Sequence, residues 1–338
     1  MKKEPGGPDG VQSQEAGKSR LLRLGGAGVG SRLDLYLATE LALSRAQVRR
    51  LLESGAVSLD GRALSLGDKG MSLPSAGILE VGAFRAVADQ RAVLASPEES
   101  PPAILAKGPG WVALDKPAGM PVHPLDEGEP GTALSHVAAL SPGIHGVGEG
   151  GLRSGIVHRL DVDTSGALLI ATEEAPWQRL RTAFHEHRVE KVYLALVQGR
   201  PDWDLSGEEM DLWLSVSRHR PARVRVATDA DRARGRARET HQHVVVLERL
   251  AETSLVEVRP LTGFLHQIRA TLAHLGHPVV GDTRYGAIPR LLGAERQMLH
   301  AQKVCFEEIQ AESPLPRDFE DVLKLARVQP ANAESTLD

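Results

Sequence analysis

The chain has 338 residues, of which 41% are hydrophobic and 25% are charged, a composition typical of a globular protein long enough for two domains. Its single cysteine, Cys305, excludes an internal disulfide framework and a cysteine-based zinc site, and it suits a reducing cytoplasm. The first residues lack the apolar core of a signal peptide, and no apolar run is long enough to span a bilayer. We therefore expect a cytoplasmic protein with no membrane partner.

The formal net charge of −4 argues weakly against a nucleic-acid binder, but the charge is unevenly distributed. Residues 218–238 carry eight Arg against two Asp, whereas residues 306–338 carry eight acidic and three basic side chains. The basic run is either a solvated face or a phosphate-binding segment, and we favour phosphate because so many close arginines repel one another without an anion. Residues 313–338 are predicted to form an acidic C-terminal tail. The Gly-rich residues 1–28 are predicted to be disordered.

A small α/β segment is predicted next, over residues 30–82. It begins with a helix from Arg32 that has leucines at helical spacing. Ser44 can cap a second helix over residues 45–53, and a strand from Val57 then enters an Asp-Gly hairpin turn. The exposed face of the second helix carries three basic side chains, Arg45, Arg49 and Arg50.

This segment resembles the ribosomal protein S-four-like RNA-binding domain. The shared pattern is Arg-Leu-Asp, then Ser-Arg-x-x-Val, then a Gly/Val/Gly pattern, here with Ala56 between Gly55 and Val57. The resemblance implies that the arginine face grips an RNA backbone. The alternative is a small helical cap with a solvated arginine face. An Ala-, Ser- and Pro-rich linker is predicted over residues 83–101.

The larger domain, predicted over residues 102–312, mixes strands and helices without regular alternation. Strands are expected at 111–115, 191–197 and 254–258, and helices at 176–187 and 266–275. This order favours an α+β domain around a largely antiparallel mixed sheet.

Residues 158–166 form the most informative loop of this domain. They lie between two apolar runs, 155–157 and 167–171, which are predicted to be buried strands. The loop carries one His, one Arg and two Asp on what should be a rigid scaffold. A carboxylate held in this way can act as a nucleophile, a general base or a metal ligand. The same composition also fits a charged surface turn.

The larger domain resembles the RluA-type pseudouridine synthases over residues 102–306. The resemblance rests on ordered motifs: Lys116-Pro-Ala-Gly-Met-Pro-Val-His-Pro124, Gly155-Ile-Val-His-Arg-Leu-Asp-Val-Asp-Thr-Ser-Gly166, Glu190-Lys-Val-Tyr193, Gly263-Phe-Leu-His-Gln-Ile-Arg269, His277-Pro-Val-Val-Gly-Asp-Thr-Arg-Tyr-Gly286 and Leu299-His-Ala301. It implies the pseudouridine synthase fold and the isomerisation of uridine to pseudouridine in RNA, with no cofactor and no metal. The implied partner is structured RNA, with large-subunit ribosomal RNA expected ahead of transfer RNA, and the expected state is a monomer.

The resemblance also implies roles for individual residues. Asp161 assists departure of the base, either by covalent attack or by removing a proton from the sugar. Tyr193 is a catalytic residue that packs on the base with its hydroxyl available for proton transfer. Arg269 pairs with Asp161, and Arg159 fills the gap left by the flipped nucleotide. His158 and Asp163 are expected to be structural. Further RNA contacts are expected from Lys116, His266 and Gln267.

One position departs from the family pattern, because Phe264 stands where the family usually has Arg. This substitution is the support for an alternative, a non-catalytic RNA-binding or ribosome-assembly factor on the same fold. A second alternative is a metal-dependent hydrolase that uses Asp161 and Asp163, but the sequence lacks the expected clusters of metal ligands.

Overall fold

The computed structural model describes residues 18–25, 28–41, 43, 45–84, 90–203, 206–219 and 221–328. The chain divides into two units, unit 1 ending at Gln90 and unit 2 beginning at Arg91. In the described part of the chain, every helix is too short or too polar to cross a membrane. The expected disorder of residues 1–17 and the proposed cap Ser44 lie outside the described residues.

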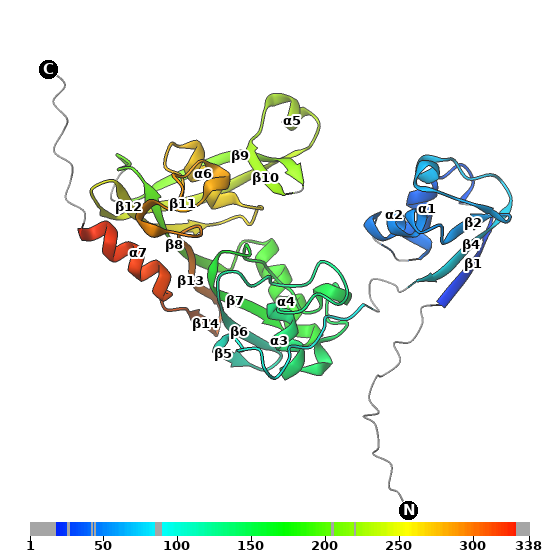
Figure 1. Cartoon of the computed structure of the whole chain (residues 1–338), viewed down its shortest axis with the longest axis horizontal. Helices are drawn as coiled ribbons and strands as arrows, with labels where there is room; N and C mark the ends of the chain where they lie inside the picture. Colours follow the sequence, from blue (N-terminus) through cyan, green and yellow to red (C-terminus); the bar gives the residue numbers. More distant parts are fainter. Residues whose placement is uncertain are drawn as a thin grey trace, which may run out of the picture. The chain divides into compact units, whose positions relative to one another are not determined.

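Unit 1 is a four-stranded antiparallel sheet covered by two helices (Figure 1). The sheet order is β1-β4-β2-β3, and its core is a cluster of leucines and valines that includes Leu37, Val48 and Leu79. The predicted hairpin turn is confirmed, since Asp60 and Gly61 both have positive φ. The bounds are β1 Lys18–Leu24, α1 Leu33–Glu40, α2 Arg45–Glu53, β2 Val57–Leu59, β3 Arg62–Ala63 and β4 Gly77–Phe84.

Unit 2 is built on a ten-stranded sheet in the order β10-β9-β11-β12-β8-β13-β7-β6-β5, with β14 paired to β13. Every pair is antiparallel except β13 with β7, so the predicted mixed, largely antiparallel sheet is confirmed. The bounds are β5 Ala103–Gly108, β6 Trp111–Lys116, β7 Ser165–Ala171, β8 Glu190–Gln198, β9 Glu208–His219, β10 Ala222–Val226, β11 Ala237–Arg249, β12 Thr253–Pro260, β13 Leu299–Phe306 and β14 Ile309–Glu312.

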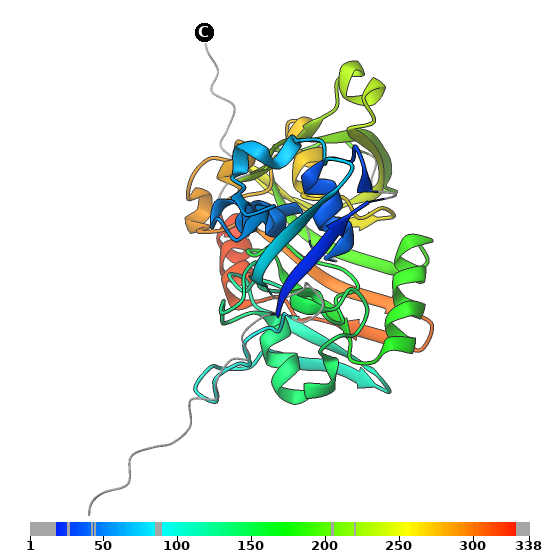
Figure 2. The ribbon, with the colours of Figure 1, turned by 90° about the vertical axis from the view of Figure 1, so that its right-hand side faces the viewer.

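The described residues of unit 2 form five α-helices; α5 lies in the projecting connection between β10 and β11, and the other four lie beside the sheet (Figure 1). The five helices are α3 Ala133–Leu140, α4 Glu174–His185, α5 Asp229–Ala233, α6 Gln267–His274 and α7 Arg317–Val328. Helix α6 packs near β9 and β10 and directs Ile268 and Leu272 into the largest hydrophobic cluster. The β9–β10 hairpin (residues 208–226) and α5 project from the end of unit 2 in both views (Figures 1 and 2).

Several sequence-based boundaries are wrong, because local composition does not show where a segment packs. The predicted tail of residues 1–28 includes β1, which pairs with β4. The predicted linker of 83–101 is shorter, since Ala92 lies buried in the core of unit 2. The predicted acidic tail contains α7, whose Phe319 is fully buried in the main cluster. The predicted strand at 155–157 is reduced to one bridge between Ile156 and Ile170.

Candidate active site

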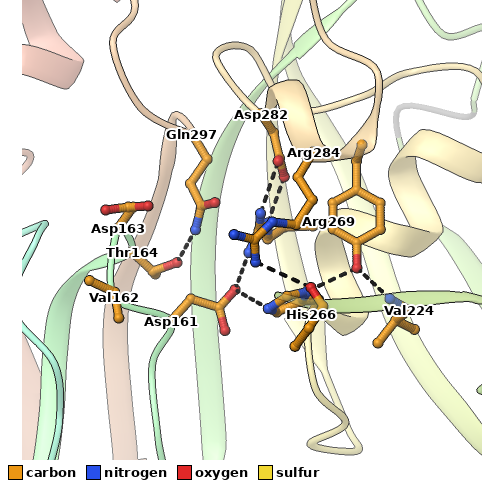
Figure 3. A network of polar contacts seen from close by, with 12 residues as sticks. Asp161, Val162, Asp163, Thr164, Val224, His266, Arg269, Asp282, Arg284 and Gln297 are labelled. Carbon is orange, nitrogen blue, oxygen red and sulfur yellow. Dashed lines mark hydrogen bonds and ion pairs between the residues drawn. The ribbon is translucent and has the colours of Figure 1, made fainter. Parts of the chain in front are cut away.

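The loop that carries Asp161 is held at two points, Val162 and Thr164. Val162 O accepts hydrogen bonds from Gly119 N at 2.9 Å and from Lys116 Nζ at 2.9 Å. On the other side, Gln297 Nε2 donates to Thr164 Oγ1 at 2.9 Å (Figure 3). A loop fixed in this way holds its carboxylate in one place, as a reacting group requires.

Lys116 is an internal brace of this loop and not a surface contact. Its side chain is 0% exposed, and Nζ also donates to Pro117 O at 2.9 Å and to Met120 O at 2.8 Å. The predicted RNA contact of Lys116 is therefore wrong, because Nζ is fully buried and its hydrogen-bond partners are backbone oxygens of the protein itself. Burial lowers the pKa of Lys116 to about 7, against the opposing attraction of the Asp163 and Asp161 carboxylates.

This pKa predicts a pH dependence of stability. The unfolded lysine keeps its proton up to about pH 10.4, so between about pH 7 and pH 10 the unfolded state binds more protons than the folded state. The free energy of unfolding should therefore rise with pH, by up to about 1.4 kcal/mol per pH unit from this group. Lys116→Met should remove that part of the slope, whereas Lys107→Met, at an exposed lysine, should keep it. Denaturant unfolding at pH 7, 8 and 9 measures the slope, and equal slopes in the parent and Lys116→Met would contradict the prediction.

Asp161 is held by a buried arginine (Figure 3). Arg269 Nη1 donates to Asp161 Oδ2 at 2.7 Å, while the other side of the guanidinium makes a bidentate pair with Asp282 at 2.5 and 2.9 Å. Arg269 and Asp282 are 6% and 2% exposed, but Asp161 is 23% exposed. Burial would lower the pKa of Arg269, but the two carboxylates outweigh it and raise the pKa above its usual value. The predicted pairing of Arg269 with Asp161 is present.

The two oxygens of Asp161 have different surroundings. His266 Nε2 lies 3.9 Å from Oδ2, the same oxygen that accepts from Arg269. Among the described residues, no hydrogen bond reaches Oδ1. Oδ1 is therefore the oxygen left open toward a substrate.

Tyr193 on β8 lies in the same cleft and packs against the two hydrophobic clusters of unit 2. Burial and the Asp161 carboxylate raise the pKa of the Tyr193 hydroxyl, so it keeps its proton at neutral pH. A protonated phenol on an apolar body can pack on a base and donate a hydrogen bond.

His158 supports the loop, as expected. Its Nε2 accepts from Leu169 N at 2.9 Å, and its ring stacks on Phe184 with centroids 4.7 Å apart. Burial lowers the pKa of His158 to about 3, so the ring is neutral and can accept this bond. Arg159 is exposed and lines the cleft, which leaves its guanidinium available to a nucleotide. Asp163 is exposed, and its backbone oxygen accepts from Arg296 at 3.1 Å.

Gln267, predicted to bind RNA, makes several hydrogen bonds inside the protein. It is 4% exposed, its Oε1 accepts from Thr262 Oγ1 and Phe264 N, and its Nε2 donates to His241 O at 3.1 Å. These bonds hold the turn before α6; Gln267 also lines the cleft, and its RNA contact stays a prediction. His266 is 8% exposed and lines the cleft beside Asp161.

Three residues of the site were given no role by the sequence. Asp282 is the second partner of Arg269, and Tyr285 Oη lies 2.9 Å from His266 Nδ1. Lys191 lines the cleft, and burial lowers its pKa to about 8. All three lie inside the family motifs, but nothing in the sequence shows that 277–286 folds back onto α6.

The cleft has a volume of about 910 Å³, which exceeds a single nucleotide base and suits an extruded nucleotide with its neighbours. Its lining has an excess of basic over acidic side chains, six against four, and this excess attracts a phosphate backbone. The basic residues are Arg153, Arg159, Arg181, Lys191, Arg269 and Arg284, and the acidic ones are Glu129, Glu149, Asp161 and Asp163. In the described ranges, no three His, Cys, Asp or Glu side chains gather closely enough to hold a metal ion.

Comparison with known proteins decides the family. The profile of the RNA pseudouridylate synthase family matches residues 110–274, which carry both Asp161 and Arg269. An uncharacterized RNA pseudouridine synthase of Mycobacterium bovis is 37% identical over 309 residues, covering 88% of this chain and 95% of its own. The chain belongs to the RNA pseudouridine synthase family.

Other members of this pseudouridine synthase family agree with the assignment. The ribosomal large subunit pseudouridine synthase D of Zymomonas mobilis is 30% identical over 322 residues, covering 90% of this chain and 96% of its own. Among solved structures, human RNA pseudouridylate synthase domain containing 4 superposes with a TM-score of 0.53 at 23% identity, covering 68% of this chain and 95% of that one. That likeness supports the pseudouridine synthase fold of unit 2.

Proposed function

We propose that the chain converts uridine to pseudouridine in structured RNA, with Asp161 as the reacting carboxylate. The observation that carries this proposal is the Asp161–Arg269 pair, 2.7 Å long, on the lining of a cleft with an excess of basic side chains, in a chain of this family. Arg269 is almost fully buried and Asp161 is partly exposed, so the carboxylate is oriented from the protein side and open on the substrate side.

The reaction is an isomerisation and needs no net oxidant or reductant. The bond from C1′ of the ribose to N1 of uracil breaks, the uracil turns, and a bond forms from C1′ to C5, which then loses its proton while N1 gains one. Asp161 Oδ1 either attacks C1′ or removes a proton from the sugar, and both routes need an ionised, fixed carboxylate. The target base has to leave its helix first. We propose that Arg159 fills the gap that the extruded base leaves in the RNA helix, and that Tyr193 packs on the base.

The non-catalytic alternative loses its structural support. The Phe264 side chain packs in a small hydrophobic cluster with Leu214, Val224 and Ala270, and it is not among the described residues that line the cleft. Its apolar ring is therefore accommodated in the fold without altering the surroundings of Asp161. The relatives are also named as synthases.

Unit 1 is proposed to be the S-four-like RNA-binding domain. The match to the Mycobacterium bovis relative covers 88% of the chain, more than unit 2 alone, so it includes part of unit 1. Its helix α2 carries Arg45, Arg49 and Arg50 on the exposed side, while Val48 and Leu52 are buried. An exposed arginine face on an otherwise well-packed small domain fits a phosphate backbone.

Removing this arginine face should weaken RNA binding without changing the chemical step. For Arg45→Ala combined with Arg50→Ala, we expect the slope of log affinity against log salt to fall by about 0.7–0.9 for each phosphate that the variant no longer binds. The value of kcat should stay within about twofold, because the substitutions lie outside the catalytic unit. Filter binding at several salt concentrations measures the slope. Arg62→Ala, which removes an exposed arginine of β3, is the control, and an equal effect there would contradict a specific role for α2.

Large-subunit ribosomal RNA is the proposed substrate, ahead of transfer RNA. The protein is proposed to be cytoplasmic and to act as a monomer. Two relatives with 30% identity are named as ribosomal large subunit pseudouridine synthases. Mapping pseudouridines across total RNA, with and without the gene, tests the activity and names the target together. We expect at least one uridine of ribosomal RNA to lose its modification in the deletion strain. An unchanged map would refute the proposed function, and a loss confined to transfer RNA would refute the proposed substrate.

A further inference from the structure

Two hydrogen bonds and one longer polar contact connect the β9–β10 hairpin to the catalytic carboxylate. Val224 N, on β10, donates to Tyr285 Oη at 2.9 Å, and Oη lies 2.9 Å from His266 Nδ1. His266 Nε2 lies 3.9 Å from Asp161 Oδ2. Figure 3 shows Val224, His266 and Asp161 in a row, with Arg269 beside them.

The hydrogen bonds of Tyr285 determine which nitrogen of His266 carries the proton. Burial lowers the pKa of His266, although the Asp161 carboxylate opposes this, so the ring is neutral at pH 7 and has one N–H. Because Val224 N–H already occupies one lone pair of Tyr285 Oη, the phenol proton is free to be donated to His266 Nδ1. The single ring proton then sits on Nε2 and faces Asp161. The opposite tautomer would leave the phenol proton without an acceptor among the described residues.

Tyr285 also touches the other group that holds Asp161. The guanidinium carbon of Arg269 lies 5.1 Å from the centroid of the Tyr285 ring, and the His266 ring meets the same ring edge-on at 5.7 Å. His266 has a positive φ of 50°, an uncommon backbone conformation for a residue other than glycine, which persists where neighbours hold it. Arg269 and His266, the two side chains nearest Asp161 Oδ2, thus both contact the side chain of Tyr285.

The hairpin at the other end of these contacts belongs to the basic segment and reaches the cleft. Ala222, at the start of β10, lines the cleft, and its backbone oxygen accepts from Arg284 at 3.2 Å. Arg223, the next residue, is exposed. A phosphate held near Arg223 would therefore lie one residue from the backbone N–H that binds Tyr285.

We propose that Tyr285 is a positioning residue, whose hydroxyl holds His266 as the Nε2–H tautomer beside Asp161 and couples the β9–β10 hairpin to the catalytic carboxylate. This inference rests on the proposed function, since it takes Asp161 as the reacting group. With Arg269 bonded to Oδ2 and His266 Nε2 lying 3.9 Å from the same oxygen, Oδ1 is left to the ribose. The hydroxyl of Tyr285 thus acts through His266 and has no contact with the substrate.

Tyr285→Phe tests the proposal, because it removes the hydroxyl and keeps the ring over Arg269. In protein labelled with nitrogen-15 at histidine, we expect the parent to show His266 as the Nε2–H tautomer and the variant to show both tautomers. The value of kcat on the target RNA should fall about tenfold, the effect of about one hydrogen bond, while KM stays within about twofold. Tyr36→Phe, the same chemical change in unit 1, should alter neither measurement.

Two results would overturn the proposal. One is a Tyr285→Phe protein that keeps both the parental tautomer and the parental kcat; the other is a rise in KM at constant kcat, which would make Tyr285 an RNA contact. If the parent forms no pseudouridine on any RNA, the proposed function fails, but the tautomer measurement still decides the role of the hydroxyl.

If the Tyr285→Phe protein fails to fold, a second pair of variants tests the proposal. His266→Gln keeps an N–H donor near Asp161, so it should retain about tenfold more activity than His266→Leu, which has none. Equal activities of these two folded variants would overturn the role assigned to the His266 N–H.

Discussion

Replacing Asp161 by Asn is expected to abolish pseudouridine formation while RNA affinity stays within about threefold. The amide keeps the size of the carboxylate but loses its charge, so it can neither attack C1′ nor remove a proton from the sugar. The loss should exceed about a thousandfold in kcat, the scale of removing a reacting group. The fold should survive, because Arg269 keeps its bidentate pair with Asp282.

Asp163→Asn is the matched control for this prediction. The same loop carries both aspartates, but the Asp163 carboxylate is exposed, whereas Asp161 contacts the buried Arg269. We expect near-parental activity from Asp163→Asn, measured on the ribosomal RNA target by chemical mapping of pseudouridine. Retained activity in Asp161→Asn would remove Asp161 from the mechanism, and equal losses in both variants would contradict a role specific to Asp161.

Replacing Arg269 by Met is expected to damage both stability and activity. Asp282 is 2% exposed and bonds both Nε and Nη2 of Arg269, so the substitution leaves a buried carboxylate without its partner. Breaking a buried ion pair from one side destabilises a protein by about 3–5 kcal/mol. Activity should fall in parallel, because Asp161 loses the donor that orients Oδ2. Denaturant unfolding and single-turnover kinetics measure the two effects.

A second substitution separates these two effects. In Arg269→Met combined with Asp282→Leu, the buried charge is gone, so most of the lost stability should return while activity stays low. The exposed pair of Arg327 with Glu248 provides the comparison, since Arg327→Met should cost less than about 1 kcal/mol. If the double variant regained activity together with stability, Arg269 would be a structural residue only.

Much of the fold could be predicted from the sequence where the pattern is local. The amphipathic helix over residues 45–53 and the Asp-Gly turn before Arg62 both have strong short-range signals, and both are present as predicted. The helix of residues 317–328 was missed, because its acidic residues suggested a tail, and only its packing through Phe319 shows that it belongs to the core. Charge composition describes a solvent-exposed face and does not report the buried one.

The candidate site divides in the same way. The sequence by itself determined the family resemblance, the choice of Asp161 and its pairing with Arg269, because these lie in motifs whose order along the chain is specific. Only the tertiary structure decided that Lys116 and Gln267 are internal braces, and that Asp282 and Tyr285 support the site. The physical reason is that burial and hydrogen-bond partners arise from contacts between distant segments. A lysine or a glutamine in a motif looks the same in sequence whether its polar atoms face RNA or the carbonyls of its own chain.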